Sequence, residues 1–178
     1  MKILILSTSL NPRSKSHTLA LRAEEHLEAE GADTVVIELG ELELPLCGSA
    51  GSFDHPKAMQ LTERIREADG VLIASPVYNY DVNAACKNAI ELTGAGWENK
   101  AVGFILAAGG QASYMSAMGL ANSLMLDFRC VIVPRFVYAT GEAFRDGALV
   151  DVKVDERLGR LARDIIRLAQ AWSMPAES

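Results

Sequence analysis

Short apolar runs recur along the chain and alternate with longer stretches of helical periodicity. Four runs rich in Ile, Val and Leu are bounded by turn or polar residues, which is typical of strands buried on both faces. They cover residues 3–6, 71–74, 101–107 and 131–133. A fifth run, at 34–37, is more amphipathic and fits a strand near the margin of a sheet.

Apolar residues spaced by three and four positions predict helices between these runs. Leu19, Ala23 and Leu27 share one helix face, and the region 158–172 repeats the same spacing. The predicted strands are 2–7, 33–38, 70–75, 101–107 and 130–134, and the predicted helices are 16–30, 56–68, 83–93, 112–127 and 154–172. Alternation of strand and helix predicts an α/β fold, a parallel sheet with helices on both faces.

The chain length and composition indicate one globular domain that spans residues 1–178. Of the 178 residues, 49% are hydrophobic and 22% are charged, so the chain can bury a core without metal or disulfide support. Two segments, 39–55 and 135–151, interrupt the alternation, and we expect a small excursion or an extra hairpin in the second.

Charge and cysteine usage narrow the partners and the compartment. A formal net charge of -6 argues against binding of a nucleic-acid backbone. Cys47, Cys86 and Cys130 are an odd number of widely spaced cysteines and form no CxxC pair, which indicates a reducing compartment. The first apolar run is too short for a signal peptide, and no run approaches the roughly 20 apolar residues that cross a bilayer. We therefore expect a cytoplasmic protein with neither a membrane nor a nucleic-acid partner.

The loop after the first strand, residues 7–18, has the composition of an anion site. It holds several hydroxyl side chains, Arg13 and Lys15, and no carboxylate, and it leads into a helix. Free N–H groups and the positive end of the helix dipole favour a phosphate there. A single Ser16 or Thr18 could simply cap the helix, but one cap needs only one hydroxyl.

The kind of phosphate ligand follows from the motifs that this loop lacks. The sequence has no GxxxxGK[ST] motif for a nucleoside triphosphate, and no GxGxxG follows the first strand to seat a dinucleotide pyrophosphate. The first strand ends in Ser7 rather than in the aspartates of a response regulator. Among phosphate-containing ligands, one with a single terminal phosphate group fits this loop best.

Two further loops follow strands and are expected at the same edge of the sheet. Residues 75–80 read Ser-Pro-Val-Tyr-Asn-Tyr, a stiff turn that can present backbone groups and an aromatic wall to a flat ring. Gly109 and Gly110 allow close backbone approach from the other side. Each loop alone could be an ordinary turn, but their expected position at the same edge of the sheet indicates a binding site.

With these motifs, the chain resembles the NADPH-dependent FMN reductase family of flavodoxin-like proteins, over residues from about 2 to 134. The resemblance is strongest at 75–79 and at Cys86-Lys87-Asn88-Ala89-Ile90-Glu91, and Lys100 and the Gly109-Gly110 pair fall at matching places. It departs where the family has a glycine-serine-x-arginine loop, since this chain has Thr8-Ser9-Leu10-Asn11 and only Arg13 to replace the arginine.

The resemblance implies a flavodoxin-like three-layer sandwich with a five-stranded parallel sheet in the order 2-1-3-4-5. It also implies FMN held without a covalent bond. Residues expected at the FMN phosphate are Ser9, Asn11, Arg13, Ser16, His17 and Thr18. Those expected along the ribityl chain and the isoalloxazine are Pro76, Val77, Tyr78 and Asn79, with Gly109 and Gly110 on the other side of the ring.

The function implied is an NAD(P)H-dependent oxidoreductase, with NADPH or NADH reducing the flavin and a small acceptor oxidising it. The acceptor stays open among quinones, flavins, azo or nitro compounds and metal oxyanions. Because the flavin carries this chemistry, no catalytic side chain is expected, and the histidines show no metal-binding spacing. The alternatives are a flavodoxin-like electron carrier and a non-enzymatic binding protein on the same fold.

Two further expectations concern the cysteines and the assembly. Lys87 could lower the pKa of its neighbour Cys86, but we expect Cys86 and Cys130 to be buried structural thiols. The predicted helix 112–127 is more apolar than one buried stripe requires, and the surplus could form a subunit interface. The resemblance implies a homodimer or a homotetramer. The apolar residues in question are Met115, Met118, Leu120, Leu124, Met125 and Leu126.

Overall fold

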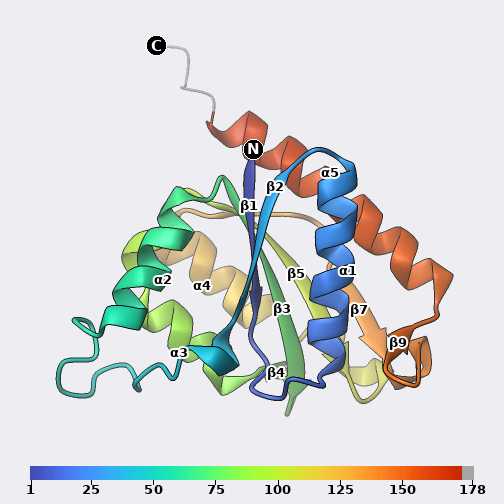
Figure 1. Cartoon of the computed structure of the whole chain (residues 1–178), viewed down its shortest axis with the longest axis horizontal. Helices are drawn as coiled ribbons and strands as arrows, with labels where there is room; N and C mark the ends of the chain where they lie inside the picture. The colour runs from blue at the N-terminus through green and yellow to red at the C-terminus, as the bar shows by residue number, and fades with distance from the viewer. Residues whose placement is uncertain (174–178) are drawn as a thin grey trace.

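The apolar runs form one largely parallel sheet in the computed structural model, which describes residues 1–173 (Figure 1). Its main strands are β1 (Lys2–Ser7), β2 (Asp33–Glu38), β3 (Gly70–Tyr78), β5 (Ala101–Ala108), β6 (Val131–Ile132) and β7 (Val137–Thr140). The strand order is β2-β1-β3-β5-β6, and β7 also pairs in parallel with β5. This order confirms the flavodoxin-like fold and the predicted arrangement 2-1-3-4-5.

The fifth strand position differs from the predicted continuous strand 130–134. β6 pairs with the start of β5, where Ala101 lies opposite Val131, and β7 pairs with its end. Pro134 and Arg135 separate the two pieces; proline has no N–H for the ladder, and Arg135 adopts a φ of 65°. With the short antiparallel strand β4 (Asp81–Val82), the sheet therefore has seven strands within the described residues rather than five.

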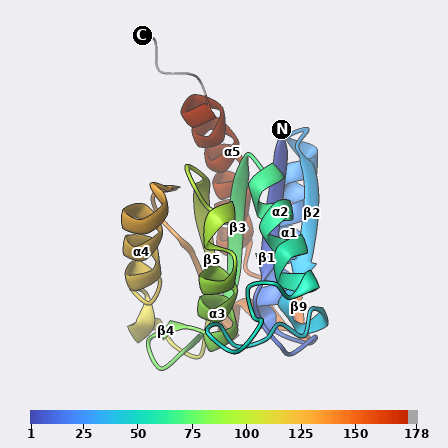
Figure 2. The same cartoon turned by 90° about the vertical axis from the view of Figure 1, so that its left-hand side faces the viewer.

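Helices cover both faces of the sheet (Figures 1 and 2). They are α1 (Lys15–Ala29), α2 (Pro56–Glu67), α3 (Ala84–Leu92), α4 (Met118–Phe128) and α5 (Val152–Ser173). Alternate residues of β1 enter different halves of the core: Ile3 packs with α1 and α5, whereas Leu4 packs with the cluster under α2, α3 and α4. None of the helices within residues 1–173 has the length and apolarity needed to cross a membrane.

Helix α4 begins six residues later than the predicted start at 112. Residues Gln111–Ser113 form a short 3-10 helix, and turns connect it to α4, whose first turn receives no side-chain cap. The apolar spacing therefore located the helix but not its start, because apolar residues also occupy the connecting turns.

The parallel strands deliver their following loops to one edge of the sheet, at the bottom of Figure 1. The expected hairpin in 135–151 is present as β8 (Phe144–Arg145) paired antiparallel with β9 (Ala148–Leu149). It lies near the start of α1, where Thr18 Oγ1 donates a hydrogen bond to the Gly147 carbonyl at 3.2 Å. This carboxyl edge is where ligands bind in open α/β sheets.

Candidate functional site

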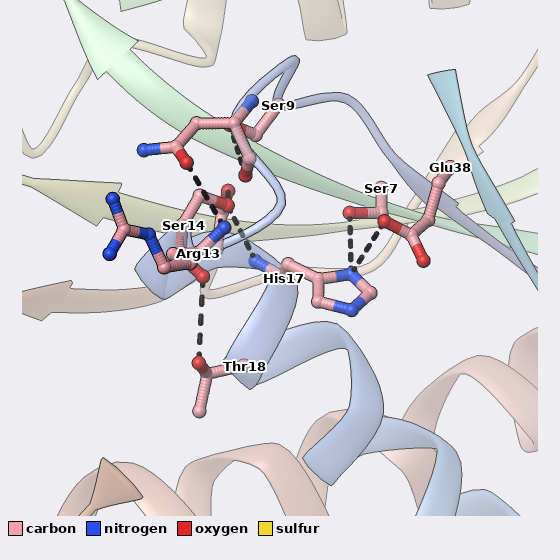
Figure 3. Close-up of polar contacts among 9 residues, drawn as sticks. Ser7, Ser9, Arg13, Ser14, His17, Thr18 and Glu38 are labelled. Atoms are coloured by element: carbon pink, nitrogen blue, oxygen red, sulfur yellow. Dashed lines mark hydrogen bonds and ion pairs between the residues drawn. The ribbon is translucent and has the colours of Figure 1, made fainter. Parts of the chain in front are cut away.

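The loop between β1 and α1 is folded by consecutive local hydrogen bonds (Figure 3). The Asn11 N–H donates to Ser9 Oγ at 3.2 Å, and the Arg13 N–H donates to Asn11 Oδ1 at 3.0 Å. The N–H of His17 donates to Ser14 Oγ at 3.1 Å, so Ser14 is the N-cap of α1. The loop thus turns tightly over the start of the helix.

The six residues predicted at the phosphate separate into two groups. Ser9 and Asn11 shape the loop itself, and the exposed Arg13 extends from it. His17 turns the other way in Figure 3: its Nδ1 lies 3.2 Å from Ser7 Oγ and 3.6 Å from Glu38. The other two predicted residues are also engaged within the protein. Ser16 is fully buried, with its Oγ 3.1 Å from Ser14 Oγ, and Thr18 donates its hydroxyl hydrogen bond to the Gly147 carbonyl.

The donor chemistry of this loop fits a phosphate. The first turn of α1 carries no acidic residue, so the positive end of the helix dipole is not compensated there. Arg13 makes no ion pair among the described residues, which leaves its guanidinium available for an anion. Glu38 lies on the His17 side, away from Arg13 (Figure 3). The residues present therefore suit the monophosphate of FMN.

A buried asparagine that the sequence did not single out joins this loop to the next strand. Thr8 Oγ1 donates to Asn83 Oδ1 at 2.7 Å, and Asn83 Nδ2 donates to the Thr8 carbonyl at 2.7 Å. Ser75 Oγ adds a contact to the same Oδ1 at 3.2 Å. All three side chains are buried. Asn83 thus fixes the first loop relative to the end of β3.

The predicted turn at 75–80 is instead the last part of strand β3 followed by the tip of a hairpin. Pro76, Val77 and Tyr78 belong to β3, which extends further than predicted and pairs with β4. Asn79 and Tyr80 form the tip with φ values of 51° and 66°, the positive values that two-residue hairpin turns require. The exposed aromatic ring of Tyr78 remains available as a wall beside a flat ligand.

The glycine pair after β5 is exposed and leaves room. A Cβ placed on Gly109 or Gly110 would meet nothing within 4 Å, so packing within the protein does not demand glycine there. A planar ligand can use this space. The hydroxyl of buried Tyr138 donates to the Gly110 carbonyl and lies 2.9 Å from Ser113 Oγ, which fixes the loop to β7. Tyr138 is a second residue that sequence reasoning missed.

The two buried cysteines are structural thiols, as expected. Burial raises the pKa of Cys86 to about 12 and the pKa of Cys130 to about 11, so both are protonated and unreactive at neutral pH. The charge of the neighbouring Lys87 acts to lower the pKa of Cys86, but burial outweighs it. Within residues 1–173, no cluster of three or more His, Cys, Asp or Glu side chains could hold a metal ion.

Other residues of the resembling motifs support the scaffold. Asn88 Nδ2 donates to the Pro45 carbonyl at 2.9 Å, and its Oδ1 accepts from the Cys47 N–H at 2.8 Å. The ammonium of Lys100 donates to two carbonyls at the end of α2, those of Arg66 and Ala68, both at 2.7 Å. Asn88 and Lys100 therefore stabilise the fold through these hydrogen bonds, away from the loops of the site.

Comparison with known proteins decides the family. Residues 1–145 match the family model for NADPH-dependent FMN reductase. The chain belongs to this family. It is therefore an oxidoreductase with FMN as its cofactor and NAD(P)H as its co-substrate.

Individual relatives agree with this membership. The chain is 31% identical to an NADPH:quinone oxidoreductase of Arabidopsis thaliana, over 98% of this chain and 92% of that protein. It is 28% identical to the NADH-dependent FMN reductase SfnF of Pseudomonas putida, over 90% and 89% of the two chains. The structure of FerB, a flavoenzyme NAD(P)H:(acceptor) oxidoreductase of Paracoccus denitrificans, superposes with a TM-score of 0.80 at 21% identity and covers 97% of this chain and 99% of that chain. This last likeness shows the shared fold.

Proposed function

We propose that this oxidoreductase passes electrons from NAD(P)H through non-covalently bound FMN to a small organic or inorganic acceptor. Candidate acceptors are quinones, free flavins, azo or nitro compounds and metal oxyanions. The observation that carries the proposal is the meeting of three different loops at one edge of the sheet: the acid-free loop before α1, the β3–β4 hairpin and the glycine pair after β5. The quinone and flavin activities in the names of the relatives support small acceptors.

Each loop has a separate task in this proposal. Ser9, Asn11 and Arg13 offer their side chains to the FMN phosphate. Ser16, His17 and Thr18, whose side chains are engaged within the protein, form the start of α1 beside it. The hairpin residues Pro76, Val77, Tyr78 and Asn79 lie along the ribityl chain and the ring, and Gly109 and Gly110 leave the opposite side open to backbone contact. When bound, FMN supplies the redox chemistry, accepting a hydride from NAD(P)H and releasing electrons to the acceptor.

The side chains of the protein position the cofactor and take no covalent part. Asn83 holds the phosphate loop against β3, and Tyr138 holds the glycine loop against β7. The two loops approach the ligand from different strands, one at its phosphate and the other at its ring, so together they fix its position along the edge of the sheet. We propose no catalytic side chain, because the flavin carries the redox chemistry.

The decisive experiment is a visible absorption spectrum of the purified protein, followed by NADH and NADPH oxidation with a panel of acceptors. We expect a flavin spectrum and rapid oxidation with at least one small acceptor. Oxidation that proceeds only when a protein electron partner is added would favour the flavodoxin-like carrier instead. A colourless preparation that fails to bind added FMN would overturn the proposal. Protein stripped of flavin is the matched control.

We also propose that the chain forms a homodimer or a homotetramer through the exposed face of α4. Leu120 and Leu124 of this helix are buried in the core, as one sheet-facing stripe requires. Met118, Met125 and Leu126 remain 44%, 42% and 75% exposed. Apolar side chains grouped in this way on one helix favour a subunit contact. The cytoplasmic location stays a prediction.

A further inference from the structure

A row of cations on α5 stands out in a chain of net charge -6. Lys153, Arg157, Arg160 and Arg167 are spaced by four, three and seven positions, which places them on one face of the helix. All four are exposed, and within residues 1–173 none of their side chains has a hydrogen-bond or ion-pair partner. Arg163, at the border of this face, is by contrast paired with Glu30 at 3.4 Å. The unpaired cations are therefore available to a ligand.

These cations line three adjoining cavities beside the connection between β6 and β7. The first, of about 260 Å³, is lined by Gln111, Thr140, Lys153 and Arg157 among others. The second, of about 290 Å³, shares Tyr114 and Arg157 with the first. The third, of about 810 Å³, shares Arg135 with the second and includes Arg167. Because neighbouring cavities share lining residues, we refer to the three together as the α5 groove.

The second cavity is the most positive part of the α5 groove. Arg135, Arg157 and Arg160 line it, and Asp164 is the only acid among its lining residues. In the first cavity, by contrast, Glu142 and Asp151 balance Lys153 and Arg157. Several guanidinium groups around one small cavity suit a dianion such as a phosphate monoester, which accepts paired hydrogen bonds from each.

The α5 groove extends from the second cavity, through the first, towards the proposed flavin site. Gln111, which lines the first cavity, directly follows Gly110 in the loop after β5. From Lys153 to Arg160 the groove follows seven residues of α5, about 10 Å along the helix axis. Tyr114 and Phe136 add aromatic rings to the lining of the second cavity. A ligand could therefore place one end at the glycine loop and a phosphate among the arginines.

We propose that the α5 groove binds the adenosine end of NADPH and that Arg135, Arg157 and Arg160 contact its 2′-phosphate. This inference rests on the proposed transfer of electrons from NAD(P)H to FMN at the glycine loop. It assigns a preference for NADPH over NADH, because NADH has a hydroxyl where NADPH carries the dianion. The aromatic rings of Tyr114 and Phe136 provide an apolar surface for the adenine.

A binding experiment tests the site without turnover. The flavin-loaded protein is titrated with 2′,5′-ADP, which carries the 2′-phosphate, and with 5′-AMP, which lacks it. We expect 2′,5′-ADP to bind at least about tenfold more tightly, and we expect Arg157→Gln and Arg160→Gln each to remove most of that difference. Arg163→Gln removes the same charge from the same helix and should change nothing. Equal binding of both nucleotides, or an unchanged preference in both variants, overturns the proposal.

Steady-state kinetics and competition with inorganic phosphate distinguish a site for NADPH from a site for any free anion. In Arg157→Gln and Arg160→Gln the KM for NADPH should rise about tenfold while the KM for NADH stays constant. If inorganic phosphate competes as strongly as 2′,5′-ADP, the groove holds a free anion and the assignment to NADPH is wrong. Normal NADPH oxidation without 2′,5′-ADP binding refutes the groove alone. Specific 2′,5′-ADP binding without any NAD(P)H oxidation supports the groove and refutes the proposed function.

Discussion

Thr8 and Asn83 form a reciprocal pair of hydrogen bonds, each 2.7 Å long, although 75 residues separate them in the sequence. One bond joins the two side chains, and the other satisfies the backbone carbonyl of Thr8. Both residues are buried, so water cannot replace either bond without reopening the loop. The position of the proposed phosphate loop is therefore set by a residue at the start of α3.

Asn83→Ala should weaken both the fold and FMN binding. The substitution leaves the buried carbonyl of Thr8 without its donor, and we expect a loss of about 1–3 kcal/mol in the free energy of unfolding. Urea denaturation measures this loss, and a flavin titration measures the affinity. Asn88→Ala is the matched control, because it also breaks two hydrogen bonds but to the segment around Pro45 and Cys47. Equal FMN affinity in both variants would contradict a positioning role for Asn83.

Arg13→Gln should lower the affinity for FMN and leave the affinity for riboflavin unchanged. Riboflavin lacks the phosphate, so the comparison isolates the proposed contact of the guanidinium with that group. We expect FMN to bind about tenfold more weakly, as for one charge-assisted hydrogen bond. Fluorescence quenching of each flavin provides the measurement. Lys57→Gln, which removes an exposed cation from α2, controls for the change in net charge. A parallel loss for both flavins would place the phosphate elsewhere.

Tyr138→Phe, unlike Arg13→Gln, should affect the binding of FMN and of riboflavin. The tyrosine hydroxyl donates to the Gly110 carbonyl, and this loop faces the proposed ring rather than the phosphate. Releasing the loop should weaken FMN and riboflavin binding alike, by about fivefold for one neutral hydrogen bond. The same fluorescence titrations test this expectation. Loss of FMN affinity alone would show that Tyr138 acts on the phosphate end.

The sequence predicted the central part of the fold because its strands are continuous apolar runs. β1, β3 and β5 are buried along nearly their whole length, and short continuous apolar runs bounded by turn residues are typical of central parallel strands. The prediction of one continuous fifth strand at 130–134 was wrong for a local reason. Pro134 and the positive φ of Arg135 interrupt the strand pairing that the apolar run alone suggested. Such a break depends on backbone conformation, which hydrophobicity does not encode.

The site was predictable where its chemistry is local and hidden where it depends on distant pairs. The hydroxyls and cations of the first loop lie together in the sequence, and so do Gly109 and Gly110. Asn83 precedes a helix and resembles an ordinary cap, although its side chain makes no cap bond and instead contacts Thr8. Tyr138 likewise lies 28 residues from Gly110. Only the folded chain brings these partners together.

Asp155→Asn should destabilise the contact between α1 and α5 in a pH-dependent way. The Asp155 carboxylate accepts from Arg22 at 2.6 and 2.9 Å and lies 2.8 Å from His26 Nε2. The hydrogen bonds from Arg22 hold the pKa of Asp155 well below its ordinary value. We expect a loss of about 1–2 kcal/mol at neutral pH, since the group is partly exposed.

The sign of the pH dependence follows from the direction of that shift. A carboxyl whose pKa is lowered by folding stabilises the protein above its unfolded pKa, about 4, and loses this contribution as the pH falls. The difference between the native protein and Asp155→Asn should therefore shrink below about pH 4, as measured by urea denaturation across the pH range. Glu30→Gln, which breaks the exposed contact with Arg163 between the same helices, should cost little at any pH. A constant difference for Asp155→Asn down to low pH would refute the linkage.

Leu126→Glu should dissociate the proposed oligomer. The Leu126 side chain is 75% exposed on α4, so a carboxylate there harms nothing in the isolated chain but would be desolvated in a subunit interface. Size-exclusion chromatography with light scattering should show a dimer or tetramer for the native protein and a monomer for the variant. Leu21→Glu, at an exposed leucine of α1, should leave the mass unchanged. A native protein of 19.2 kDa in solution, or a variant with the native oligomeric mass, would exclude α4 as the contact.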